Sequence, residues 1–148
     1  MKKQIIAGIL GLTMVAGLST PAFAAIDFFN EIENNDTFKR ANEFPLKTHT
    51  MINGKASRDD DYDYFKFKAP ETTFYTFDFG AANIELPVEG AEVTLYDANR
   101  KKITSGEVDS RNELKFSEKL IKDQEYFIRV ENNSSRFYDY ILEVYKRN

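Results

Sequence analysis

Residues 62–68 read Tyr-Asp-Tyr-Phe-Lys-Phe-Lys, and their side chains alternate between the two faces of an extended chain. The two tyrosines fall on one face, whereas Phe65 and Phe67 fall on the other. A period of two residues is the pattern of a β-strand. Pro70 ends the stretch, because proline has no backbone N–H to donate to a neighbouring strand. The stretch therefore predicts a strand with one aromatic, buried face.

Similar patterns recur along the chain, separated by turn residues. Seven further strands are expected, at Thr48–Asn53, Thr72–Phe79, Ala91–Tyr96, Lys101–Ser105, Glu113–Ser117, Gln124–Glu131 and Tyr138–Tyr145. The fourth and fifth of these are polar, so we place them at sheet edges. Thirteen Phe and eight Tyr supply enough apolar area to fill the interior between two sheets. The sequence thus predicts an all-β protein, an antiparallel β-sandwich of seven to eight strands over residues 48–148.

Residues 25–47 precede these strands and are expected to be irregular. One short turn is expected at Thr37–Ala41, and Pro45 prevents a longer helix there. We expect this segment and residues 48–148 to form one domain.

Residues 1–24 have the pattern of a secretory signal peptide. Lys2 and Lys3 are followed by the uncharged apolar run Ile5–Leu18 and by an Ala22-Phe23-Ala24 cleavage site. The apolar run is shorter than the ~20 residues that a membrane span needs. We therefore expect a secreted, extracellular protein with no membrane contact after cleavage. Loss of both lysines would change the formal net charge from −4 to −6, and this acidity argues against nucleic acid as a partner.

Few residues are available for catalysis. The chain has no Cys, which excludes thiol chemistry, and its single histidine, His49, lies beside no Ser or Asp in the sequence. A carboxylate pair for glycoside hydrolysis stays open, because the chain has 24 acidic residues. We expect no enzymatic activity, since a small domain whose aromatic residues fill the core leaves little room for a deep cleft.

Two acidic clusters stand out: Glu31-Ile32-Glu33-Asn34-Asn35-Asp36 and Arg58-Asp59-Asp60-Asp61-Tyr62-Asp63. Carboxylates at this density repel one another unless water or a cation neutralises the repulsion. Calcium takes about six to eight oxygen ligands from carboxylates, amide carbonyls and backbone, so these residue types suit it. Two solvated acidic loops are the alternative.

The same two clusters resemble motifs of the bacterial pre-peptidase C-terminal (PPC) domain, the family that includes the collagen-binding domains of clostridial collagenases. The first cluster resembles the opening motif E-x-E-x-N-D. The second, preceded by Gly54, resembles the motif D-x-x-D-[YW]-[YF]-x-F. Three later motifs are V-x-L-Y-D at 93–97, Y-[YF]-[IL]-x-V at 126–130 and Y-x-L-x-V at 140–144. The resemblance spans residues 29–146 and implies a jelly-roll-like β-sandwich.

In the collagenase members of this family, calcium lies between the N-terminal segment and the loop before the D-Y strand. The resemblance therefore implies calcium as a cofactor, with six side-chain ligands: Glu31, Glu33, Asn35, Asp36, Asp60 and Asp63. It also implies backbone contacts near Gly54 and Lys55. Bound calcium would clamp residues 25–47 onto the sandwich and partly replace the missing disulfides.

The resemblance gives weaker support to collagen binding. Three positions that hold exposed tyrosines in the collagenase domains correspond here to Ser105, Glu131 and Asn133. Aromatic residues supply much of the binding energy of shallow interfaces. We therefore predict a secreted, non-catalytic, calcium-stabilised module, a monomer that binds an extracellular protein or polymer and stands alone behind its own signal peptide. A collagen- or matrix-binding adhesin and a regulator or inhibitor of a separate secreted peptidase are the alternatives.

Overall fold

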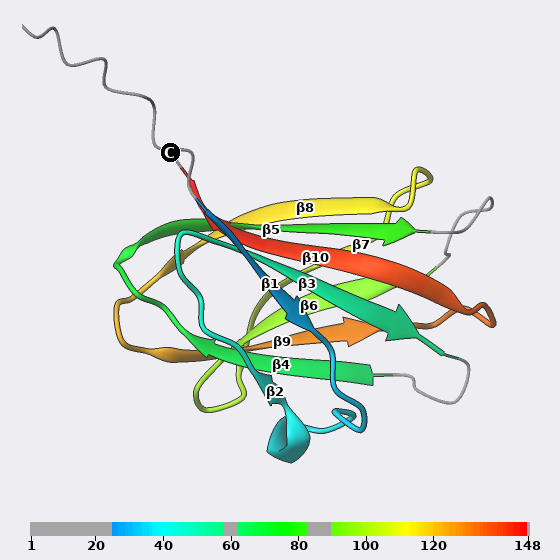
Figure 1. Cartoon of the computed structure of the whole chain (residues 1–148), viewed down its shortest axis with the longest axis horizontal. Helices are drawn as coiled ribbons and strands as arrows, with labels where there is room; N and C mark the ends of the chain where they lie inside the picture. Colours follow the sequence, from blue (N-terminus) through cyan, green and yellow to red (C-terminus); the bar gives the residue numbers. More distant parts are fainter. Residues whose placement is uncertain (1–24, 58–61, 83–89, 148) are drawn as a thin grey trace, which may run out of the picture.

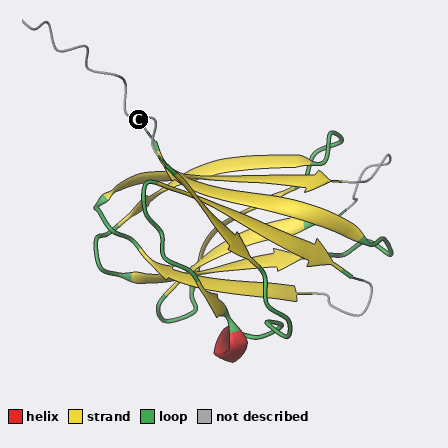
Figure 2. Ribbon diagram, in the orientation of Figure 1, coloured by secondary structure: helices red, strands yellow, loops and turns green. Residues whose placement is uncertain are grey.

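The computed structural model describes residues 25–57, 62–82 and 90–147, which fold into two packed five-stranded sheets (Figures 1 and 2). The first sheet has the order β1 (Ile26–Asn30), β3 (His49–Ala56), β10 (Tyr138–Lys146), β5 (Thr73–Ala82) and β8 (Glu113–Leu120). The second has the order β2 (Asn42–Glu43), β4 (Tyr62–Lys68), β9 (Glu125–Glu131), β6 (Glu92–Asp97) and β7 (Lys102–Glu107). The helical element in these ranges is one 3-10 turn, η1 (Phe38–Arg40). No helix within them has the length and apolar character needed to cross a membrane. The expected signal peptide, residues 1–24, lies outside the described residues.

Alternation along the strands builds the core between the two sheets. In β4, Phe65 and Phe67 point inward and are 0% and 1% exposed. Inward residues of both sheets join them in one hydrophobic cluster, which includes Ile52, Tyr75, Phe77, Phe79, Val93, Leu95, Ile128, Val130, Tyr140, Leu142 and Val144. The predicted β-sandwich is confirmed, and each of the eight predicted strands corresponds to one of β3–β10.

The N-terminal segment is more ordered than the predicted irregular stretch. β1 pairs in parallel with β3, from Ile26 beside His49 to Asn30 beside Asn53, and β2 pairs in parallel with β4. Between them the chain crosses from the first sheet to the second through the expected short turn, η1 (Figure 1). The described sandwich therefore has ten strands, two of them parallel edge strands. With five and two residues, β1 and β2 are too short for periodicity to reveal them.

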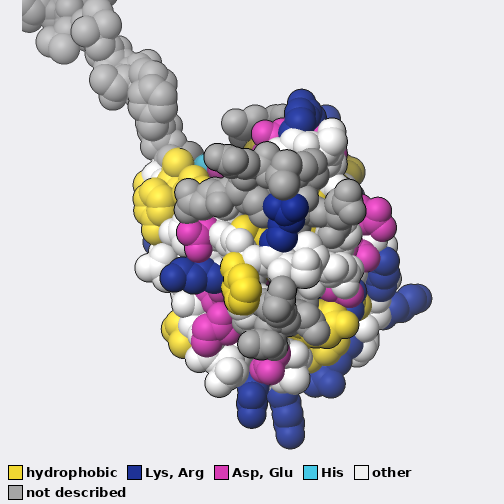
Figure 3. Space-filling model, turned by 90° about the vertical axis from the view of Figure 1, so that its right-hand side faces the viewer, with side chains coloured by type: hydrophobic (Ala, Val, Ile, Leu, Met, Phe, Trp, Pro, Cys, Tyr) yellow, Lys and Arg dark blue, Asp and Glu magenta, His cyan; other side chains and the backbone are white. Residues whose placement is uncertain are grey.

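The surface offers no single feature that marks a binding face in the view of Figure 3. On this end of the sandwich, the described hydrophobic side chains form separate patches among acidic and basic ones (Figure 3). Scattered apolar side chains are normal on a protein surface. The apolar side chains visible in Figure 3 therefore do not mark a binding face.

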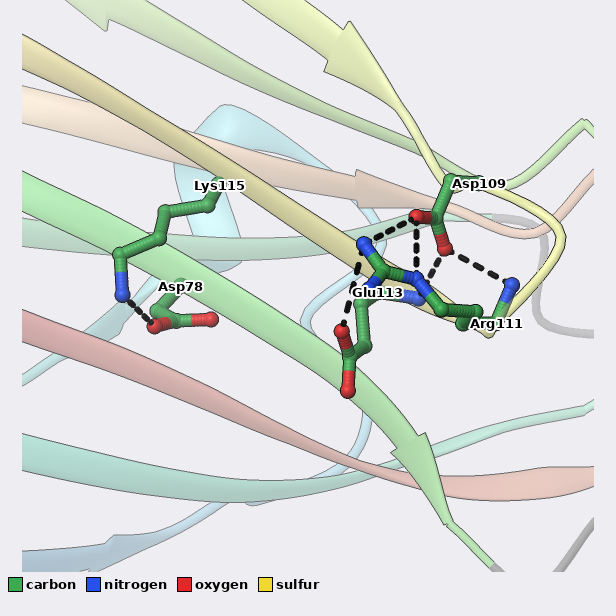
Figure 4. Close-up of polar contacts among 5 residues, drawn as sticks. All are labelled: Asp78, Asp109, Arg111, Glu113 and Lys115. Carbon is green, nitrogen blue, oxygen red and sulfur yellow. Dashed lines mark hydrogen bonds and ion pairs between the residues drawn. The ribbon is translucent and has the colours of Figure 1, made fainter.

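The two polar strands predicted at sheet edges, β7 and β8, do lie at edges. The turn that connects β7 to β8 is stabilised by hydrogen bonds to the carboxylate of Asp109 (Figure 4). Its Oδ1 accepts the backbone N–H of Arg111 at 2.8 Å and that of Glu113 at 3.1 Å, and Oδ2 lies 2.9 Å from Arg111 Nη2. The bond from the Arg111 backbone, together with the guanidinium, lowers the pKa of Asp109 below its ordinary value.

Asp109→Asn is expected to destabilise the protein near neutral pH and to have little effect in acid. Because the pKa of Asp109 is lower in the folded than in the unfolded state, its ionised form contributes stability above the unfolded-state pKa. That contribution is lost as the pH falls through the folded-state pKa. Melting temperatures of the protein and the variant, measured from about pH 7 to about pH 2, should converge at the acid end. A difference that stays constant over this range would contradict the prediction.

Candidate metal centre

Three carboxylates meet where the N-terminal segment crosses between the sheets. Glu31 directly follows β1, Glu33 lies two residues further on, and Asp63 is the second residue of β4. One carboxylate oxygen of each lies within 4.8 Å of the others. The alternation that turns Phe65 inward also turns Asp63 inward, so Asp63 is only 3% exposed. The fold thus brings together acids from both clusters, and we call these three residues the acidic triad.

Backbone hydrogen bonds on both sides of the crossing fix its path. The N–H of Glu31 donates to the carbonyl of Asn53 at 2.9 Å, which extends the pairing of β1 with β3. The N–H of Tyr64 donates to the carbonyl of Asn35 at 2.9 Å, which attaches the segment to β4. Between these bonds the chain bends at Glu33, and the Glu33–Asn34 peptide bond is cis. Each sheet therefore holds one end of residues 31–35, which we call the crossing segment.

Asn35 adds a fully buried amide beside the triad. Its Nδ2 donates to Glu31 Oε1 at 2.9 Å, and the residue is 0% exposed. Its Oδ1 accepts no hydrogen bond from any residue that the structure describes. Oδ1 belongs to the same small amide group as Nδ2, which bonds to the triad. A buried oxygen without a donor is destabilising, and a cation is a group that would satisfy it.

The hydroxyl of Tyr140 connects the triad to the first sheet. It donates to Asp63 Oδ2 at 2.7 Å and lies 3.4 Å from Glu31 Oε1. Burial raises the pKa of Tyr140 well above its ordinary value, and the neighbouring charges of Asp63 and Glu31 raise it further. Burial, with a smaller effect of Asp63, also raises the pKa of Tyr138. Tyr140 therefore keeps its proton and remains a donor to the triad.

Gly54 and Lys55, at which the resemblance implied backbone contacts, both border this site. A Cβ on Gly54 would lie 2.2 Å from Cζ and 2.4 Å from the hydroxyl oxygen of Tyr140. The position therefore needs glycine so that the Tyr140 ring can approach the strand. The N–H of Lys55 donates to Glu31 Oε2 at 2.8 Å.

Two other predicted ligands are not part of the triad. Asp36 is exposed, and its Oδ1 lies 3.5 Å from Nη1 of Arg40, four residues later. Asp60 lies outside the described residues. Sequence reasoning missed Tyr140 as a site residue. Alternation in the last strand indicates that its ring points inward, but no pattern indicates a bond to Asp63, 77 residues away.

The oxygen atoms at this site suit a hard divalent cation. The carboxylates of Glu31, Glu33 and Asp63 and the Oδ1 of Asn35 are the ligand types that calcium prefers. Structural zinc sites use nitrogen and sulfur ligands instead. An open pocket of about 590 Å³ borders Glu31 and Glu33 and extends over β3 and β10. An ion could therefore reach the triad from solvent.

The three positions that the resemblance aligned with exposed tyrosines of collagenase domains lie on or beside the outer face of the second sheet. Ser105 lies on β7 and Glu131 at the end of β9, in neighbouring rows of side chains. Asn133 lies in the loop after β9, and its Nδ2 donates to the carbonyl of Gly90 at 2.8 Å. Each of the three positions therefore presents a polar side chain.

Phe38 of η1 packs against the aromatic side chains of the same face. Its ring centroid lies 4.5 Å from that of Tyr64, 5.1 Å from that of Tyr96 and 5.3 Å from that of Phe127. These contacts attach η1 to the second sheet. Tyr64 and Phe127 are buried beneath Phe38, whereas Phe38 and Tyr96 are partly exposed.

The single histidine lies away from the triad, on the outer face of the first sheet. Nε2 of His49 lies 2.5 Å from Oε2 of Glu143. Its ring packs at 5.1 Å from the ring of Tyr145. Among the described residues, no hydroxyl group forms a hydrogen bond with His49.

Comparisons with known proteins show the fold. No family model and no curated protein matches the chain. Among solved structures, the PPC domain of a collagenase from Bacillus anthracis aligns with a TM-score of 0.54 at 19% identity, over 70% of this chain and 93% of that one. The Yersinia pseudotuberculosis-derived mitogen aligns with a TM-score of 0.51 at 12% identity, over 70% and 89%. PliG, a periplasmic inhibitor of g-type lysozyme from Aeromonas hydrophila, aligns with a TM-score of 0.43 at 12% identity, over 83% and 100%. The alignment with the collagenase domain shows that the chain has a β-sandwich fold similar to that of a PPC domain.

Proposed function

We propose that the protein is a secreted, non-catalytic β-sandwich module that calcium stabilises and that binds an extracellular protein or polymer. The observation that carries the proposal is the acidic triad beside the buried Oδ1 of Asn35, which has no donor among the described residues. Glu31, Glu33, Asp63 and Asn35 would hold the ion. The PPC-like fold and the five ordered motifs support a relationship to PPC domains.

Calcium would act as a clamp between the crossing segment and the body of the sandwich. Glu31, Glu33 and Asn35 belong to the segment, whereas Asp63 belongs to β4 and is bonded to Tyr140 of β10. One ion would thus join three parts of the chain that are distant in the sequence. A ligand that binds only the folded state stabilises it by mass action. Extracellular calcium modules have a Kd of about 0.1–1 mM, a range suited to the surroundings of a secreted protein.

Two observations support a ligand other than collagen and a role other than catalysis. Ser105, Glu131 and Asn133 replace the expected aromatic side chains, and Phe38 packs over the buried rings of Tyr64 and Phe127. The only histidine is paired with Glu143, and the chain has no cysteine.

Calcium is expected to raise the melting temperature of the purified protein above its value in EGTA. At a concentration about a hundredfold above Kd, mass action gives about 2.7 kcal/mol, which corresponds to about 10 °C for a domain of this size. Magnesium at the same concentration is the control and should give a smaller shift, because it requires strict octahedral geometry and keeps several waters. Equal melting temperatures in calcium and in EGTA would overturn the proposal.

A further inference from the structure

A second open pocket lies on the outer face of the first sheet, toward the opposite end of β10 from Tyr140. Its volume is about 630 Å³, and it lies across β5, β8 and the end of β10. It is lined by Thr76, Lys115, Phe116, Ser117, Tyr145, Lys146 and Arg147. Three of these residues are basic and three carry hydroxyl groups, whereas none is acidic. This is the composition of an anion site within a chain whose formal net charge is −4.

The basic side chains keep a local excess of positive charge. Lys115 Nζ lies 2.5 Å from Asp78 Oδ2 (Figure 4), and Lys146 Nζ lies 2.6 Å from Glu71 Oε2. Arg147 is exposed and has no acidic partner in the described part of the chain. Its backbone N–H donates to the carbonyl of Phe74 at 2.9 Å, which fixes the residue beside the sheet. One guanidinium therefore remains available for an anion.

The hydroxyl pair at this pocket has a proton to donate. Thr76 is 4% exposed, and its Oγ1 lies 3.0 Å from Oγ of Ser117 across the β5–β8 pairing. The two hydroxyls carry two protons, and their mutual hydrogen bond uses only one of them. No described residue accepts the second proton. An oxyanion in the pocket would accept it.

We propose that this pocket binds an oxyanion of the phosphate or sulfate class. Arg147 supplies an unpaired positive charge, and Lys115 supplies a charge that it shares with Asp78. The Thr76–Ser117 pair supplies a hydroxyl donor. Lys119 lies on the same outer face of β8, two residues beyond Ser117. A polymer with repeated phosphate or sulfate groups would contact Lys119 with its next group. This inference rests on the polymer binding of the proposed function and gives that polymer a chemical class, but it does not depend on calcium.

The test is titration of the protein with inorganic sulfate and inorganic phosphate, in EGTA and at constant ionic strength set by chloride. Backbone amide shifts in NMR spectra should change saturably at Ser117 and Arg147. Arg147→Gln removes the unpaired guanidinium, and Ser117→Ala removes the exposed hydroxyl of the Thr76–Ser117 pair. Each variant should weaken anion binding about tenfold. The matched control is Lys102→Gln, a basic residue of the second sheet paired with Glu92 at 3.3 Å, which should leave binding unchanged. Melting temperatures verify that each variant is folded.

Amide chemical shifts that change linearly with anion concentration, without saturation, would overturn the proposal. Equal losses of anion affinity in Lys102→Gln and Arg147→Gln would overturn it as well. Dextran sulfate and polyphosphate then identify the source of the anion, with uncharged dextran as the control. If either charged polymer binds and Arg147→Gln weakens that binding, the result supports the site. The polymer that binds more tightly shows whether the site prefers phosphate or sulfate groups. Because the titration is done in EGTA, its failure is distinct from failure of the calcium proposal.

Discussion

Asp63→Asn is expected to abolish the calcium-dependent rise in melting temperature while leaving the fold intact. Asp63 is the buried member of the triad and the one that belongs to the body of the sandwich. Asparagine has nearly the same size and can still accept the hydrogen bond of Tyr140. It lacks the negative charge that calcium needs, and charge count strongly affects the affinity of such sites. The measurement is the melting temperature in calcium and in EGTA for the protein and the variant.

Asp36→Asn is the matched control for this variant. The resemblance to PPC domains implied that Asp36 is a ligand, but the structure places its carboxylate on the surface beside Arg40. We therefore expect Asp36→Asn to keep the calcium-dependent shift. If instead Asp63→Asn kept the shift, the acidic triad would not be the calcium site.

Gly54→Ala is expected to destabilise the protein by about 2–3 kcal/mol, which lowers the melting temperature by about 10 °C. The added Cβ would lie 2.2 Å from Cζ of Tyr140, so the ring or the strand must move. Displacing the ring would break the hydrogen bond from its hydroxyl to the buried carboxylate of Asp63, which costs stability. Thermal melting in EGTA measures the effect without any contribution from calcium.

Gly80→Ala provides the comparison. Gly80 also lies within a strand of the first sheet, one residue from the position that pairs with Tyr140, but a Cβ there meets no atom within 4 Å. This variant is expected to be neutral or more stable by up to about 1 kcal/mol, because alanine restricts the unfolded chain. Equal stability losses in the two variants would contradict the close approach of Tyr140.

A double-mutant cycle can attribute the loss to the ring of Tyr140. Tyr140→Leu removes the atoms that a Cβ on Gly54 would meet. Gly54→Ala should therefore destabilise the Tyr140→Leu protein much less than the parent, with a coupling energy of about 1–3 kcal/mol. Additive effects would indicate that the clash is with something other than this ring.

Much of the fold could be predicted from local patterns. The alternation of residues 62–68 predicts a buried face at Phe65 and Phe67, and the same period places Asp63 with them. The edge positions of β7 and β8 followed from their polar sequences. β1 and β2 could not be found this way, because a short edge strand depends on its partner more than on its own sequence.

The candidate site was predictable only in part. Glu31, Glu33 and Asp63 lie in the acidic clusters, and the structure brings them within reach of one ion. The bond between Tyr140 and Asp63 depends on packing of one sheet against the other, for which the sequence carries no periodic signal. Asp36 belongs to the same cluster as Glu31, but η1 places Arg40 beside it at the surface. Membership of an acidic run therefore does not decide which carboxylates meet.

The hydrogen bond from Tyr140 to Asp63 also gives the site an intrinsic optical probe. The electronic spectrum of a phenol depends on the charge of the group that accepts its hydrogen bond. A metal ion bound to Asp63 would change the charge at that acceptor. The chain contains no Trp, so tyrosine absorption and emission are not masked by indole. A calcium titration followed in the near ultraviolet should thus report ion binding without a label, and Tyr140→Phe should remove that part of the signal.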